Sequence, residues 1–254
     1  VDIVVIGEQV WYSANAAFTT FRDGSPIPLV QDSLQWSLLN GPARSVLEPG
    51  DPNVLDPLNA EDYARTAIYY NHAVTTDSRG VCPDGWRVPA QFDWENLTSH
   101  LGGMMAAGTK MKSTSGWQAL GSNSDRDPNG TNESGFNGYP TGYRTDTGEF
   151  YYRELFGAYW ATDEVAVDTA RIYHLSFFFP DLFPLTNHQN YGLPIRCMRD
   201  LMDAQITSPM PDVITDRSVT VMADVFDDGG LPVVSKGVLI GDTPNVDFDN
   251  NIGF

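Results

Sequence analysis

A glycine-rich interval in the middle of the chain limits the folds that are open to it. Residues 113–149 contain seven glycines between Gly116 and Gly148, and many of the residues around them are Asn, Ser and Asp. These residue types favour turns and loops over regular elements. The whole chain, with 23 Gly, 17 Pro and only 19% charged residues, continues this pattern. It therefore favours a loop-rich fold with short strands over a helical bundle.

The chain is long and apolar enough to bury a core. Hydrophobic residues make up 41% of its 254 residues, including 6 Trp, 11 Tyr and 13 Phe. This composition argues against disorder. No apolar run reaches the roughly 18 residues of a membrane-spanning helix, so no membrane span is expected.

Acidic residues give the chain a formal net charge of −18. A surface of this sign repels nucleic acid, so no nucleic-acid partner is expected. The excess fits a secreted protein and is compatible with divalent cations as partners. Its simplest role is to keep the protein soluble.

Two helices are expected in the first half of the chain. Asn59 is a good N-cap for a helix over residues 59–74, in which apolar side chains recur at spacings of four, three and four. A second helix is expected over residues 91–101, with Phe92, Leu97 and Leu101 as its buried face and two glycines after its end.

Short strands are expected on both sides of these helices. Two lie within residues 1–21, and others lie at 159–161, 171–179 and 193–198. A seam near residues 200–211 separates a domain of residues 1–200 from a segment of residues 201–254. In that segment, strands at 218–226 and 232–240 are joined by a hairpin-type turn, Asp-Asp-Gly-Gly.

Several short motifs, taken together, resemble one bacterial family. They are IGEQVW at residues 6–11, CPDGWRVPAQFDWE at 82–95, SGF at 134–136, GYR at 142–144, YWAT at 159–162 and IRCMRD at 195–200. Their identity and order are similar to the Fibrobacter succinogenes major paralogous domain, over roughly residues 1–200. The resemblance departs from that family at residues 68–74 (IYYNHAV), where a tryptophan is often found.

The resemblance implies a fold and a location rather than an activity. The family is found in surface and secreted proteins of Bacteroidota and Fibrobacterota, and it is similar to the C-type-lectin-like fold. The expected fold class is therefore α+β: a C-type-lectin-like domain with two helices, short twisted antiparallel strands and long loops, followed by a short all-β segment. That segment, residues 201–254, looks like part of an immunoglobulin-like repeat.

The cysteines Cys82 and Cys197 are the only two in the chain. Their number alone fits either one disulfide in an exported protein or two buried thiols. The resemblance implies that they form a disulfide, because the family fold joins such a pair. It also implies an extracellular or cell-surface location.

An acidic loop is the best candidate for a metal site. Its ligands would be Asp125, Asp127 and Asn129, which match the D-x-D-x-N-G half of a calcium loop, with Thr131 and Glu133 beyond them. The twelfth position, which usually supplies a bidentate Glu, is a phenylalanine. The competing interpretation is a solvated turn without calcium.

Aromatic residues are the other candidates. A partner surface is expected at Phe177, Phe178, Phe179 and Phe183, within a run that could instead cover the core. Tyr151, Tyr152 and Trp117 could stack on sugar rings or belong to the core.

Ser33 and Thr169 lie in short motifs, DSL and DTA, that resemble O-glycosylation sites of Bacteroidota. No nucleotide-binding or nucleophile motif is present, and the four histidines lack a paired ligand spacing. We therefore expect a non-catalytic binding module that recognises a glycan or a surface protein. The alternative is a structural subunit that self-assembles into a surface layer or filament.

Overall fold

The chain divides into two compact units, Val1–Asp200 and Leu201–Phe254. The computed structural model describes residues 2–47, 68–119 and 127–200, together with the backbone of four short strands between residues 205 and 227. Every described side chain belongs to the first unit.

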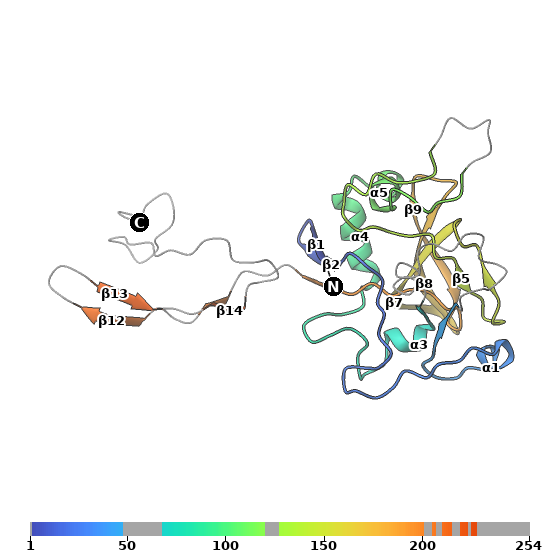
Figure 1. Cartoon of the computed structure of the whole chain (residues 1–254), viewed down its shortest axis with the longest axis horizontal. Helices are drawn as coiled ribbons and strands as arrows, with labels where there is room; N and C mark the ends of the chain where they lie inside the picture. Colours follow the sequence, from blue (N-terminus) through green and yellow to red (C-terminus); the bar gives the residue numbers. More distant parts are fainter. Residues whose placement is uncertain are drawn as a thin grey trace. The chain divides into compact units, whose positions relative to one another are not determined.

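A three-stranded antiparallel sheet forms the centre of the first unit (Figure 1). Its strands are β7 (Phe156–Ala166), β8 (Thr169–Ser176) and β9 (Leu182–His188), in that order. In the register, Tyr159 pairs with Tyr173, and His174 pairs with Phe183.

Both faces of this sheet are covered, which explains why its sequence alternates so weakly. Ala158, Trp160 and Ile172 belong to one buried cluster, called the first core cluster. Tyr159 and Tyr173 belong to another, called the second core cluster. Strands buried on both faces are continuously apolar rather than alternating, because each side chain meets a core. The run YWA at residues 159–161 is consequently fully buried.

Two helices and a small sheet cover one face. The helices are α4 (Gln91–His100), as predicted from residues 91–101, and α5 (Met104–Met111). Beside them lies an antiparallel sheet in the order β1 (Ile3–Ile6), β2 (Gln9–Tyr12) and β10 (Met198–Asp200). Trp94 of α4 is stacked on Tyr173, with ring centroids 4.9 Å apart.

The other face packs against short elements and loops. These are β3 (Arg44–Val46), β4 (Ile68–Tyr70) and α3 (His72–Thr75), with β3 and β4 paired. Three further elements lie at the edge of the unit: α1 (Ser33–Ser37), β5 (Tyr143–Arg144) and β6 (Phe150–Tyr151).

The predicted helix at residues 59–74 is wrong where the structure describes it. Residues 68–70 form β4, and helix begins only at His72. The side chains of Tyr69 and Tyr70 are both buried, and their hydroxyls donate to Thr141 O and Phe18 O. Partners on two sides fit a strand and not one helical face, so tertiary packing overrides the helical spacing. Residues 59–67 lie outside the described residues.

The expected α+β, C-type-lectin-like fold is also wrong. Strands contain more of the described residues than helices do, and they lie in small antiparallel sheets. The described helices are short, and the described part of the expected first helix, residues 68–74, contains β4 and the start of α3. The first unit is better described as a mostly β fold with four short described helices.

Described strands of the second unit pair in two antiparallel couples. They are β11 (Gln205–Ile206) with β14 (Val225–Asp227), and β12 (Met210–Ile214) with β13 (Val219–Met222). The strand predicted at 218–226 is therefore two strands. The strand predicted at 232–240 lies outside the described residues, and the immunoglobulin-like assignment stays a prediction.

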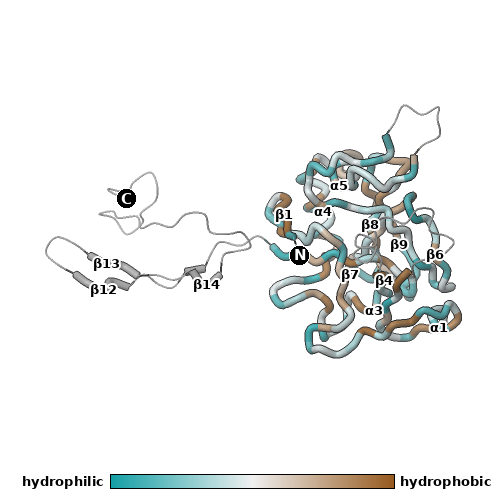
Figure 2. The backbone as a smooth tube through the Cα atoms, viewed as in Figure 1, coloured by the Kyte–Doolittle hydropathy of each residue, from teal (hydrophilic) through white to brown (hydrophobic). Residues whose placement is uncertain are grey.

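Apolar residues occur in short stretches along the described backbone (Figure 2). No helix within the described residues is long and apolar enough to cross a membrane.

Two buried arginines bind backbone carbonyls of loops. The Arg196 guanidinium donates to the oxygens of Tyr12, Phe136 and Asn137, and it lies over the Phe136 ring. Arg144 donates in the same way to Val30 O, Gln31 O and Gly148 O. Burial lowers the pKa of both guanidinium groups. Each arginine thus supplies the hydrogen bonds that loop carbonyls need when they are buried.

Candidate functional site

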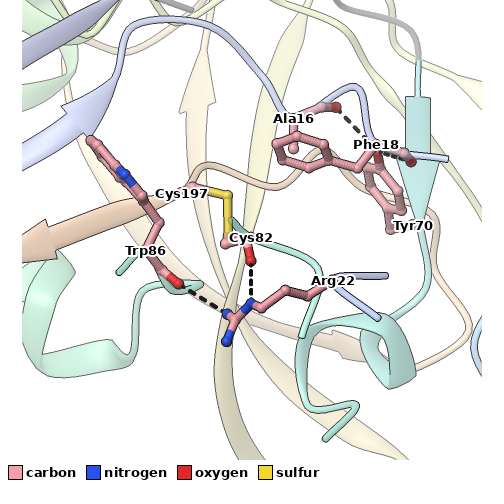
Figure 3. The surroundings of a disulfide bond; sticks show 7 residues. All are labelled: Ala16, Phe18, Arg22, Tyr70, Cys82, Trp86 and Cys197. Carbon is pink, nitrogen blue, oxygen red and sulfur yellow. Dashed lines mark hydrogen bonds between the residues drawn. A yellow bond between two sulfur atoms is a disulfide. The ribbon is translucent and has the colours of Figure 1, made fainter. Parts of the chain in front are cut away.

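The expected disulfide is confirmed: Cys82 and Cys197 are bonded across a separation of 115 residues. Both residues are buried in the first core cluster. Arg22 lies beside the bond and donates from Nε to Cys82 O at 3.0 Å and from Nη2 to Trp86 O at 3.4 Å (Figure 3). Since both cysteines are bonded, the chain has no free thiol to serve as a nucleophile or metal ligand.

A row of aromatic rings, each in contact with the next, runs across one end of the central sheet. We call it the aromatic strip. Neighbouring centroids along it lie 5.0 to 6.4 Å apart, within the usual range for interacting rings. In order of contact, its members are Tyr191, Tyr143, Tyr152, Phe156, Phe177, Phe178, Phe179 and Phe183.

Much of the strip is accessible to solvent. Phe178 is 52% exposed, Phe179 46% and Tyr152 46%, and Tyr151, which contacts Tyr152, is 50% exposed. Aromatic side chains of this size usually contribute their area to a core or an interface. The other members of the strip are partly buried, and the row with these exposed rings is the strongest candidate for a binding surface.

The register of the central sheet explains why the strip forms. His174 pairs with Phe183 on β9 and with Ala158 on β7, so it shares a face with the buried Trp160 and Ile172. The Phe156 ring contacts His174 at 4.5 Å. The apolar face thus continues past the end of the core. Burial lowers the pKa of His174 to about 4, so this imidazole is neutral at neutral pH.

The run at residues 177–184 divides between the two roles that the sequence left open. Leu182 is fully buried and Phe177 packs against the second core cluster. Phe178 and Phe179 remain half-exposed, and their rings connect Phe177 to Phe183. The structure therefore brings the four predicted phenylalanines together.

Sequence reasoning missed most of the tyrosine half of the strip. Tyr151 and Tyr152 were candidates for sugar stacking, but Tyr143 and Tyr191 were not. They come from β5 and from the turn after β9, and only the fold brings them together. Gly142 allows the backbone of β6 to lie close to that of β5, because a Cβ there would lie 2.3 Å from Tyr151 O. Trp117 is only 5% exposed and is a core residue.

A buried lysine holds the phenylalanine end in place. The Lys112 Nζ donates to Pro128 O at 2.8 Å, Ser176 O at 3.2 Å and Phe179 O at 3.4 Å. Its side chain also lies near the Trp117 ring. One ammonium group therefore connects the backbone of the loop after β8 to that of the acidic loop.

The acidic loop shows no calcium cage in its described part. Asp127 Oδ1 accepts hydrogen bonds from the backbone and side-chain nitrogens of Asn129, while Asn129 Oδ1 accepts from Trp117 N. Thr131 and Glu133 are exposed. Among the residues described, no cluster of three or more His, Cys, Asp or Glu could hold a metal. Asp125 lies outside them, so the calcium site stays a prediction.

The two glycosylation candidates are both partly buried. Ser33 begins α1, is half-buried, and donates from Oγ to Gly148 O at 3.2 Å. Thr169 begins β8, next to an exposed turn in which Val167 is 87% exposed. Their modification stays a prediction.

Comparison with known proteins gives one match. The family model of the Fibrobacter succinogenes major domain matches residues 4–199. Searches of curated proteins and of solved structures gave no match. The matched range contains the disulfide and the whole aromatic strip. Because the match covers most of the chain, this protein belongs to the Fibrobacter succinogenes major domain family.

Proposed function

We propose that this chain is a non-catalytic binding module of a secreted or cell-surface protein, and that the aromatic strip is its ligand-contacting surface. The observation that carries the proposal is the continuous row of contacting rings, of which Tyr152, Phe178 and Phe179 are about half-exposed. Aromatic side chains contribute much of the energy of recognition, because they bury a large area at low entropic cost.

The disulfide supports an extracellular setting. Disulfides persist in oxidising compartments and are rare in reducing ones. The acidic charge of the whole chain is compatible with that setting and with ligands other than nucleic acid. The expected ligand is a glycan or a surface protein.

A binding screen with a matched pair of variants tests this function. The full chain is applied to a glycan array and to immobilised mucin, in calcium and again in EDTA. Two variants are tested beside it. The double variant Phe178→Ser/Phe179→Ser changes the strip, and Phe92→Ser changes an exposed phenylalanine of α4 outside the strip. We expect the double variant to bind at least ~10-fold more weakly, and Phe92→Ser to bind like the wild type.

Failure of the wild type to bind any of these probes at micromolar concentration would refute the proposal. Equal binding by the double variant would move the ligand site away from the strip. Loss of binding in EDTA would support the calcium loop.

The half-exposed phenylalanines also favour a second candidate, a structural subunit of a surface assembly. A neighbouring copy could cover Phe178 and Phe179. Light scattering over a range of concentrations separates the two candidates. Growth of particle size that the double serine variant abolishes would favour assembly.

A further inference from the structure

We propose that the tyrosine end of the aromatic strip, formed by Tyr143, Tyr152 and Tyr191, stacks against an uncharged sugar unit of an external polysaccharide. This inference rests on the proposed binding function and names the ligand class of the same surface.

Tyr152 is the most open ring at this end, at 46% exposed, whereas Tyr143 and Tyr191 are partly buried against the first core cluster. Centroids lie 5.5 Å apart for Tyr191 and Tyr143, 5.4 Å for Tyr143 and Tyr152, and 5.1 Å for Tyr152 and Phe156. Rings this close touch one another, so no side chain or cation fits between these neighbours. They follow one another as a row in which neighbouring rings are tilted by 43° to 58°. A linear polysaccharide chain matches such a row. A protein partner would need a wider surface, because a protein interface covers roughly 800 Å² on each partner.

Polar groups at this end suit a sugar. After burial, the largest cause, the neighbouring phenols of Tyr152 and Tyr191 help to raise the pKa of Tyr143 to about 12. The pKa of Tyr191 is also raised, first by burial and then by Asp146 and Tyr152. This end of the strip carries three phenol hydroxyl groups on rings in contact. Each can donate and accept a hydrogen bond. A sugar unit combines an apolar face with surrounding hydroxyls and needs both features.

Charge selects against acidic polymers. The Asp146 carboxylate acts on the Tyr191 phenol, and the chain carries a formal charge of −18. An anionic polysaccharide would be repelled, while a neutral one would find a carboxylate that accepts its hydroxyl protons. The phenylalanine end has rings without hydroxyls, so sugar recognition is assigned to the tyrosines.

The backbone at Tyr152 points to the same end. Tyr152 has φ 63°, in a region that bulky residues rarely adopt. Its carbonyl accepts from Phe156 N at 3.0 Å, and Glu154 N donates to Pro140 O at 2.9 Å, which holds the turn. The ring is 46% exposed, so the core does not account for it. A strained residue that presents an accessible ring fits a binding role.

Affinity electrophoresis of the full chain tests this inference. The gels contain a neutral polysaccharide (β-1,4-glucan, mannan or galactan) or an acidic one (polygalacturonate or alginate). We expect retardation in at least one neutral gel and none in the acidic gels. Tyr152→Asn should weaken that binding ~10-fold or more. Its melting temperature should stay equal or rise, because Asn tolerates positive φ.

Two further variants complete the design. Tyr143→Phe keeps the ring and removes only the hydroxyl, so binding should weaken by roughly threefold. Phe92→Ser should bind like the wild type.

Retardation only by acidic polymers, or undiminished binding by Tyr152→Asn, would overturn the inference. If the Phe178→Ser/Phe179→Ser variant loses a ligand that Tyr152→Asn keeps, the binding function stands and the sugar assignment fails. Absence of any ligand in every assay removes both. Dimers that Tyr152→Asn disperses would show that a second copy covers these rings, which also overturns the inference.

Discussion

Single buried polar residues carry much of the organisation of this loop-rich unit. Arg196 is 1% exposed and lies in the IRCMRD motif, directly before a bonded cysteine. A charged residue is usually expected at the surface, so its burial could not be deduced from its type. Its position is explained by the carbonyls of Tyr12, Phe136 and Asn137, which come from distant segments and need donors.

We expect Arg196→Met to lower the free energy of unfolding by about 2–4 kcal/mol. Three carbonyls lose their donor at about 1–3 kcal/mol each, and relief of the buried charge offsets part of that loss. Urea denaturation measures the change. Arg171→Met is the control, because Arg171 is half-buried and donates only to the side chains of Gln91 and Thr186. A similar loss in both variants would contradict this role.

At the scale of helices and strands, the sequence predicted those features that depend on interactions between residues close together in the chain. The sequence predicted α4 and the phenylalanines of one loop. It misplaced the helix at 59–74, because β4 exists through pairing with β3 and burial on both sides. It also missed Tyr143 and Tyr191, which meet only through the fold. Residues far apart in sequence leave no periodic signal of their contact.

Helix α4 gives a test of this distinction. Phe92 was predicted to be buried with Leu97 and Leu101, yet it is 68% exposed, while Trp94 is fully buried. The Trp94 ring contacts those of Trp11, Phe136, Tyr159 and Tyr173. We expect Trp94→Ala to cost about 3–5 kcal/mol of unfolding free energy.

Phe92→Ser is the matched control two residues away and should change that free energy by less than about 0.5 kcal/mol. Urea denaturation monitored by circular dichroism measures both. Comparable losses would mean that α4 presents a different face to the core.

At the scale of the whole molecule, the disulfide covalently links two residues that lie far apart in the sequence of a unit rich in loops. It joins the segment before α4 to the segment before β10, and both of its cysteines lie in the first core cluster. Long loops make the unfolded chain entropically favourable, and a bond that closes a loop of this length restricts that state most. An oxidising location would therefore be part of how this acidic chain stays folded.

We expect loss of the Cys82–Cys197 bond to lower the free energy of unfolding by about 4–5 kcal/mol, from the entropy of a closed loop of over 100 residues. Urea denaturation of the wild type with and without dithiothreitol measures this difference. The Cys82→Ala/Cys197→Ala variant should start at the lower value and be insensitive to the reductant. An unchanged midpoint for the reduced wild type would show that packing around Arg22 and Trp86 suffices. In that case the bond would give no reason to place this protein in an oxidising compartment, and its extracellular location would need support from elsewhere.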